Sequence, residues 1–163
     1  MDKIVLFDFT TTTSNSPWQV INDGVMGGRS KSDFSLSKSG HGIFKGQVSL
    51  ENNGGFCSIR LQMKKIDITG STKVFLRIKG DNKRYQFRLK PNTNDYYNYI
   101  AYFDSGSQWE TIQIALKDFY PNFRGRKLDM SNFDHQQLTE IGFLIGNKKA
   151  ERFTLEIDAI WLE

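Results

Sequence analysis

Apolar and polar residues alternate with a period of two along much of this chain. Residues 85–90 read YQFRLK and alternate without a break, and residues 57–63, 111–116 and 153–161 follow the same pattern. Strict alternation means that one face of a strand is buried and the other is in water, which is typical of antiparallel sheets. The pattern therefore predicts antiparallel strands at all four segments.

Shorter apolar segments predict further strands near residues 4–9, 43–50, 73–80, 97–104 and 138–145. Turn sequences rich in glycine, asparagine and serine separate them. Helix is scarce: one turn is expected at residues 116–119, and another at residues 134–137, where Asp134 caps it. Eight or more short strands at this spacing predict an all-β sandwich or barrel, and the length of 163 residues predicts a single domain over residues 1–163.

The alternation also places individual side chains. In the C-terminal segment it puts Ala159 and Trp161 on the buried face. If residues 81–84 form a hairpin loop, Arg77 lies directly opposite Arg88, and like charges opposed on a sheet are destabilising. Two interpretations stay open: the arginines extend into water or pair with nearby acids, or they face an anionic group of a partner or ligand.

Charge and composition narrow the function classes. The chain has 22 basic and 18 acidic residues, a net charge of +4, spread along its length. Nucleic-acid-binding proteins usually concentrate positive charge in a patch, so we expect no nucleic-acid partner. No apolar run approaches the ~20 residues of a membrane span, so we expect no direct membrane insertion. Because strand-like sequence begins almost at once, without a signal or transit peptide, we expect a soluble protein in the cytoplasm or a mature organellar form.

The sequence gives no support for a catalytic or metal-binding motif. The glycine-rich stretch at residues 22–30 lacks the spacing of a phosphate-binding loop, and His41 and His135 share no local motif with Cys57. Cys57, the single cysteine, follows Phe56 in an alternating segment and is expected to be a small buried hydrophobe. We therefore expect a protein that is not an enzyme and has no cofactor or metal. An enzyme whose residues converge from distant segments remains as a further alternative.

Several sequence blocks, in order over nearly the whole chain, resemble a known family. They are NDGVMGGRS at residues 22–30, ENNGGF at 51–56, LRIKGD at 76–81 and FYPNFRGR at 119–126. With Trp18 and Arg60, these blocks resemble the signature of the complex I intermediate-associated protein 30 family. The resemblance implies a galactose-binding-like jelly roll, in which two antiparallel sheets pack face to face. It also implies a chaperone of complex I (NADH:ubiquinone oxidoreductase) assembly, without known catalysis, whose protein partners are respiratory-complex subunits.

Two functions are therefore weighed: a non-catalytic assembly module, and a carbohydrate or small-molecule binding module of the jelly-roll type. The second function is suggested by a tyrosine cluster, Tyr96, Tyr97, Tyr99 and Tyr102. The residues predicted to bind a partner or ligand are Asp23, Met26, Arg29, Asn53, Arg60, Arg77, Arg88 and Arg124. Residues 22–30 are either a partner-binding loop beside residues 52–55 or a structural loop in which Met26 plugs the core.

Overall fold

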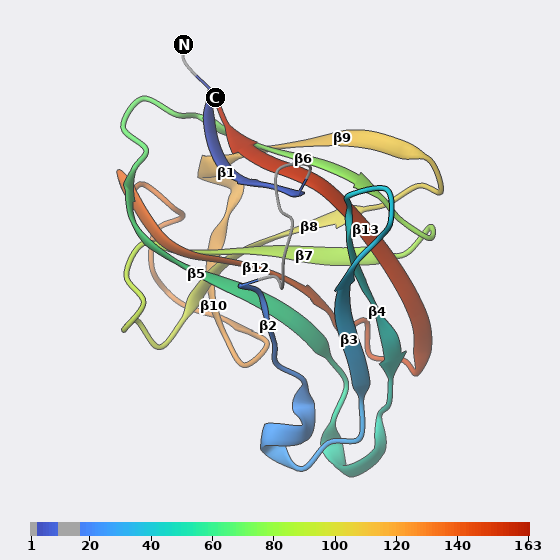
Figure 1. Cartoon of the computed structure of the whole chain (residues 1–163). Helices are drawn as coiled ribbons and strands as arrows, with labels where there is room; N and C mark the ends of the chain where they lie inside the picture. The colour runs from blue at the N-terminus through green and yellow to red at the C-terminus, as the bar shows by residue number, and fades with distance from the viewer. Residues whose placement is uncertain (1–2, 10–16) are drawn as a thin grey trace.

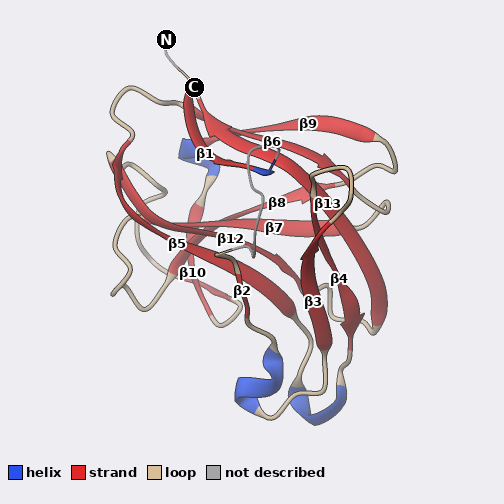
Figure 2. Ribbon diagram, viewed as in Figure 1, coloured by secondary structure: helices blue, strands red, loops and turns tan. Residues whose placement is uncertain are grey.

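The protein is a β-sandwich of two antiparallel sheets packed face to face, as predicted (Figure 1). The computed structural model describes residues 3–9 and 17–163, with the backbone alone at residues 25 and 26. Within this part of the chain nearly all regular structure is strand, and the helical segments are single short turns (Figure 2). None of these described helices has the length and apolar composition needed to cross a membrane.

The two sheets differ in their strand order. Sheet A has the order β3-β4-β13-β6-β9, and β1 also pairs with β13. Its strands are β1 (Ile4–Asp8), β3 (Lys31–Leu36), β4 (Gly42–Val48), β6 (Lys73–Lys79), β9 (Trp109–Ala115) and β13 (Glu151–Leu162). Sheet B has the order β11-β10-β8-β7-β12-β5-β2. Its strands are β2 (Gln19–Val20), β5 (Cys57–Asp67), β7 (Arg84–Lys90), β8 (Asn98–Asp104), β10 (Tyr120–Phe123), β11 (Arg126–Lys127) and β12 (Gln137–Ile145). The short helical turns are η2 (Asp23–Met26), η3 (Glu51–Asn53) and η4 (Leu116–Asp118).

The core lies between the sheets and follows from the alternation. In β7, Tyr85, Phe87 and Leu89 are fully buried, whereas Arg88 lies on the opposite face. Cys57 at the start of β5 is also fully buried, which confirms its prediction as a small buried hydrophobe. The six largest fully buried side chains among the described residues are all aromatic: Tyr85, Phe9, Phe44, Phe87, Phe119 and Phe143. Because each such side chain buries about 150–250 Å², the contact between the sheets is the main source of stability.

The alternation fails in β13 because this strand contains a bulge. The register with β6 shifts between Ile157 and Ala159. After the shift, Ile160 is fully buried, whereas Trp161 stacks on Phe75 of β6 with ring centroids 5.4 Å apart. The prediction that Ala159 and Trp161 face the core is therefore wrong. An extra residue at a bulge reverses the face that every later residue occupies.

The predicted hairpin that opposes Arg77 and Arg88 is also wrong. Arg77 is on β6 in sheet A, and Arg88 is on β7 in sheet B. The β6–β7 connection crosses between the sheets beside the β8–β9 connection, where Ser105 N donates to Lys83 O at 3.0 Å. A Cβ on Gly80 would lie 2.1 Å from the Cβ of Ser105, so the close crossing requires glycine. A short polar loop suits a hairpin and a crossing equally well, so loop length alone does not distinguish them.

One of the two expected helical turns is present. η4 confirms the turn at residues 116–119, whereas the turn predicted at residues 134–137 is wrong, since residues 134–136 form no helix and Gln137 begins β12. Phe133 N instead donates to Phe119 O at 2.9 Å, because this segment bonds to a neighbouring segment and not to itself. The alternation does not predict β2, β3, β10 or β11, which are short or interrupted by polar residues or proline.

Candidate functional site

The outer face of sheet B places a glycine between two arginines. Gly142 of β12 is paired with Arg60 of β5 on one side and with Arg88 of β7 on the other. Adjacent strands lie about 4.8 Å apart, so the two arginine Cα atoms are about 10 Å from each other. Gly142 has no side chain between them, and a Cβ built there would lie 2.7 Å from Ile59 O. Arg60 and Arg88 are called the arginine pair below.

A short hydrogen-bonded chain holds Arg88 in place. Its Nε donates to Gln86 Oε1 at 3.1 Å, and Gln86 Nε2 donates to the Tyr102 hydroxyl at 3.1 Å. Burial lowers the pKa of Arg88 to about 10, while nearby Tyr102 and Glu140 act in the opposite direction. The guanidinium therefore stays protonated at neutral pH, although its partial removal from water is unfavourable.

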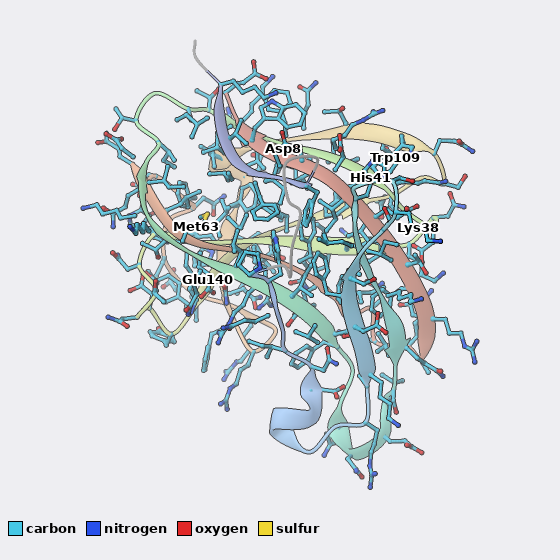
Figure 3. The ribbon with its side chains drawn as sticks, viewed as in Figure 1. Asp8, Lys38, His41, Met63, Trp109 and Glu140 are labelled. Atoms are coloured by element: carbon cyan, nitrogen blue, oxygen red, sulfur yellow. The ribbon has the colours of Figure 1, made fainter. Side chains whose placement is uncertain are left out.

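No acid among the described residues forms a direct ion pair with either member of the arginine pair. Across residues 3–9 and 17–163, no Asp or Glu oxygen forms an ion pair with either guanidinium. Arg60 Nε makes only a long contact, 3.5 Å, to Gln19 Oε1, and no described group accepts a hydrogen bond from the terminal nitrogens of either arginine. Glu140, labelled in Figure 3, is 5% exposed and accepts from Gln62 Nε2 at 3.4 Å. Glu140 therefore acts on Arg88 without a direct ion pair, and the pair carries a net positive charge on a half-buried surface.

Apolar residues lie beneath this polar layer. Ile100, opposite Arg88, is 1% exposed, and Leu144, opposite Gln86, is 6% exposed. Both are on the outer face of sheet B and not in the core between the sheets. The stems of long polar side chains can cover apolar surface while their polar ends stay in water. The layer around the arginine pair is thus closely packed, which lowers the entropy lost when a partner binds.

Sheet A has a smaller polar and aromatic group on its outer face. The ring centroids of Trp109 and His41 are 4.5 Å apart, and the Arg77 guanidinium lies 5.8 Å from the Trp109 ring. His41 Nε2 lies 3.7 Å from Asp158 Oδ1. Figure 3 shows His41 and Trp109 close together and well away from Glu140. Arg77 is therefore on a different face of the molecule from the arginine pair.

A buried carboxylate organises the loop that contains Asp23. Asp23 is 1% exposed. Its oxygens accept from Ser30 N at 3.0 Å, Ser30 Oγ at 2.5 Å, Gly55 N at 2.6 Å and Phe56 N at 3.2 Å. Burial alone would raise the pKa of Asp23, but the bonds from the Ser30 hydroxyl and from the three backbone N–H groups hold it below its usual value. These bonds join the two glycine-rich blocks on which the family resemblance rests.

Two glycines pack directly against this carboxylate. A Cβ on Gly28 would lie 2.3 Å from Asp23 Cγ, and a Cβ on Gly54 would lie 2.5 Å from Asp23 Oδ2. Gly27 ends η2 with a φ of 88°, a conformation that favours glycine. Close packing and backbone conformation thus explain these glycines, whereas the predicted role of Met26 as a plug of the core falls on a side chain outside the described residues.

The predicted binding residues fall in four separate places. Arg60 and Arg88 are together on sheet B, Asp23, Arg29 and Asn53 are in the loops at one end of the sandwich, Arg77 is on sheet A, and Arg124 is in the β10–β11 turn. Arg29 and Asn53 are exposed, whereas Asp23 bonds to its own loops. The side chain of Met26 lies outside the described residues. Arg124 is exposed at a φ of 50°, with its guanidinium 5.1 Å from a phenylalanine ring.

The tyrosine cluster is divided by the fold. Ring centroids are 5.0 Å apart for Tyr96 and Tyr97, and 5.6 Å apart for Tyr97 and Tyr99. Tyr99 is buried, its hydroxyl lies 3.1 Å from His135 Nε2, and burial raises its pKa to about 12. Tyr102 lies instead on the outer face of sheet B, beside the arginine pair. Sequence reasoning named Tyr102 and both arginines but missed Gln86 and Gly142, because only strand register brings these residues together.

The groups that could bind a metal ion or act as a nucleophile are few and separated among the described residues. Residues 3–9 and 17–163 hold no group of three His, Cys, Asp or Glu side chains that could bind a metal ion. Cys57 is fully buried, and burial raises the pKa of its thiol to about 11, which disfavours the reactive thiolate. His41 contacts Trp109, and His135 contacts Tyr99, so the two histidines have separate environments.

The sequence matches one family model over most of its length. The model describes Complex I intermediate-associated protein 30 (CIA30), and it matches residues 7–157. The chain belongs to the CIA30 family. A CIA30 protein of Drosophila melanogaster, named Complex I intermediate-associated protein 30, mitochondrial, is 28% identical over 98% of the present chain and 62% of the relative. The present chain thus spans less than two thirds of the length of this curated relative.

Solved structures similar to this CIA30 domain include several carbohydrate-binding modules. A family 11 module from Clostridium thermocellum, in complex with a β-1,3-1,4-mixed-linked tetrasaccharide, has a TM-score of 0.69 and 18% identity, covering 98% of this chain and 94% of the module. The agarase AgWH50C has a TM-score of 0.64 and 13% identity, covering 100% of this chain and 24% of the agarase. At these identities the likeness shows the fold, a galactose-binding-like jelly roll.

Proposed function

We propose that this CIA30 domain is a non-catalytic binding module that assists the assembly of respiratory complex I and holds a protein partner on the outer face of sheet B. The main support is the match to the CIA30 family over residues 7–157. The surface chemistry agrees with this function. Arginine and tyrosine are among the residue types that contribute most binding energy at protein interfaces, and Gln86 links Arg88 to Tyr102 on this face.

Carbohydrate binding is the second candidate function. It is supported by the fold similarity to the family 11 carbohydrate-binding module, and by the exposed ring of Tyr102 on the outer face of sheet B, whose hydroxyl accepts from the buried amide of Gln86. Protein binding is favoured over it because a neutral sugar would cover the arginine pair without neutralising its charge, which is unfavourable in a partly buried site.

Affinity purification of the tagged full chain from its native source, under gentle extraction, tests the assembly function. We expect subunits of respiratory complex I among the co-purified proteins. A photocrosslinking residue in place of Tyr102, on sheet B, should label these subunits more strongly than one in place of Thr111, on the outer side of sheet A. Recovery of no respiratory-complex subunit would overturn the proposal, and specific signals on a glycan array would then favour the second function.

The same purification experiment tests in which cellular compartment the protein acts. The prediction of a cytoplasmic or mature organellar protein stays untested, while the Drosophila relative is named as mitochondrial. Complex I subunits encoded or assembled in the mitochondrion, if recovered, would assign the protein to that organelle.

A further inference from the structure

We propose that the arginine pair binds a carboxylate of an acidic segment of the partner protein, placed over Gly142. The inference rests on the proposed function and adds the chemistry of the partner. It also includes Gly142 in the site, as the residue above which the anion lies. No sequence motif suggests this role.

Unused hydrogen-bond donors are the first support. Each arginine uses only its Nε in a bond to the protein, to a glutamine oxygen at 3.1 Å for Arg88 and at 3.5 Å for Arg60. The terminal nitrogens of both guanidinium groups have no acceptor among the described residues. A guanidinium matches the geometry of a carboxylate and can form two parallel hydrogen bonds with it.

Strand geometry is the second support. Arg60 and Arg88 are the residues paired with Gly142 on its two sides, and each Cα is about 5 Å from that of Gly142. An extended arginine side chain reaches farther than this, so both guanidinium groups can approach one anion above the glycine. A larger residue at position 142 would fill that space, and its Cβ would also meet Ile59 O at 2.7 Å.

The charge around the pair favours an acidic segment. Two residues before Gly142 on β12, Glu140 is paired with Lys90 of β7. The positive charge of the pair therefore continues along β7, with a single acid, Glu140, beside it. Lys90 Nζ donates to Asp95 O at 2.8 Å and forms no ion pair with a described acid. A segment with acidic residues that follows β12 would meet complementary charge, whereas a neutral oligosaccharide would not.

Titration calorimetry with defined peptides tests the inference directly. The probes are a capped hexaglutamate peptide, its hexaglutamine counterpart and a neutral mixed-linked glucan tetrasaccharide. We expect the protein to bind hexaglutamate, with an affinity that falls as salt rises, and to bind the other two at least about tenfold more weakly. Each of R60Q and R88Q should weaken hexaglutamate binding at least about tenfold. The matched control R152Q changes an exposed arginine on sheet A and should leave binding unchanged.

The outcomes separate this inference from the proposed function. Equal loss of binding in R152Q, or tighter binding of the tetrasaccharide than of hexaglutamate, would overturn the inference. In the purification experiment, the folded double variant R60Q/R88Q should no longer recover the respiratory subunits that the unmodified chain recovers. If it recovers them equally well, the assembly function stands and the inference fails, and if the unmodified chain recovers none, the assembly function itself fails. Urea unfolding of each variant establishes that it is folded.

Discussion

Replacing Asp23 with asparagine should strongly destabilise the protein while leaving its shape unchanged. The carboxylate is 1% exposed and accepts four hydrogen bonds, from Ser30 N, Ser30 Oγ, Gly55 N and Phe56 N. Hydrogen bonds to a charged group each contribute about 1.5–3 kcal/mol, and neutral ones about 1 kcal/mol. Asparagine has the same size, but it offers one oxygen in place of two, and its amide group must face at least one N–H donor.

We therefore expect Asp23→Asn to lower the free energy of unfolding by about 3–5 kcal/mol, a large part of the 5–15 kcal/mol of a typical domain. For a chain of this length, each kcal/mol corresponds to about 2–4 °C, so the melting temperature should fall by roughly 6–20 °C. Urea unfolding followed by tryptophan fluorescence measures the change as a lower midpoint at unchanged slope. The matched control is Asp104→Asn, whose carboxylate is 86% exposed and which should change stability by less than about 0.5 kcal/mol.

The pH dependence gives a second check on the same residue. Because the folded protein holds the pKa of Asp23 below its usual value, the stabilisation is complete above the unfolded pKa, near 3.8. It is lost as the pH falls through the lower folded pKa. The difference between the unmodified protein and Asp23→Asn should therefore be constant near neutrality and shrink below about pH 4. An Asp23→Asn variant as stable as Asp104→Asn at pH 7 would refute this account of the loop.

Three further predictions concern a glycine packed against Asp23, the single cysteine and a buried tyrosine. Gly28→Ala should lower the free energy of unfolding by at least about 2 kcal/mol, because its Cβ would lie 2.3 Å from Asp23 Cγ. Gly24→Ala is the control, because a Cβ at Gly24 has no atom within 4 Å and should change stability little. Urea unfolding midpoints compare the two variants. Cys57 should resist a thiol reagent at pH 8 in the folded protein and react after unfolding, because burial raises its pKa to about 11; rapid labelling of the native protein would contradict its burial. In a spectrophotometric titration, Tyr99→Phe should remove an ionisation near pH 12 that the unmodified protein shows.

Much of the fold can be predicted from the sequence because side-chain alternation is local. The YQFRLK segment and the segment around Cys57 show their buried face directly, and both form strands in which that face contacts the core. The bulge in β13 could not be predicted, because Asp158 and Ala159 fit an unbroken strand equally well. The crossing between β6 and β7 was missed because a polar loop such as residues 81–84 also suits a hairpin.

The sequence alone predicts less of the candidate site than of the fold. Arg60 and Arg88 stand out as single residues, but their relation depends on Gly142, which is more than fifty positions farther along the chain than either. That relation comes from the order β7-β12-β5, which no local pattern specifies. In contrast, the contact between the loops of Asp23 and Gly55 could be anticipated, since two glycine-rich blocks already suggested neighbouring loops.

The position of β13 determines when sheet A can form on the ribosome. This strand pairs with β1, β4 and β6, all of which are synthesised well before it. About 100 residues separate Val48 of β4 from Glu151 of β13, and at roughly 5–20 residues per second their synthesis takes about 5–20 s. During that interval β4 exposes one unpaired edge, which is a hazard for aggregation. Sheet A can therefore be completed only after residues 151–162 have been synthesised and fill its centre.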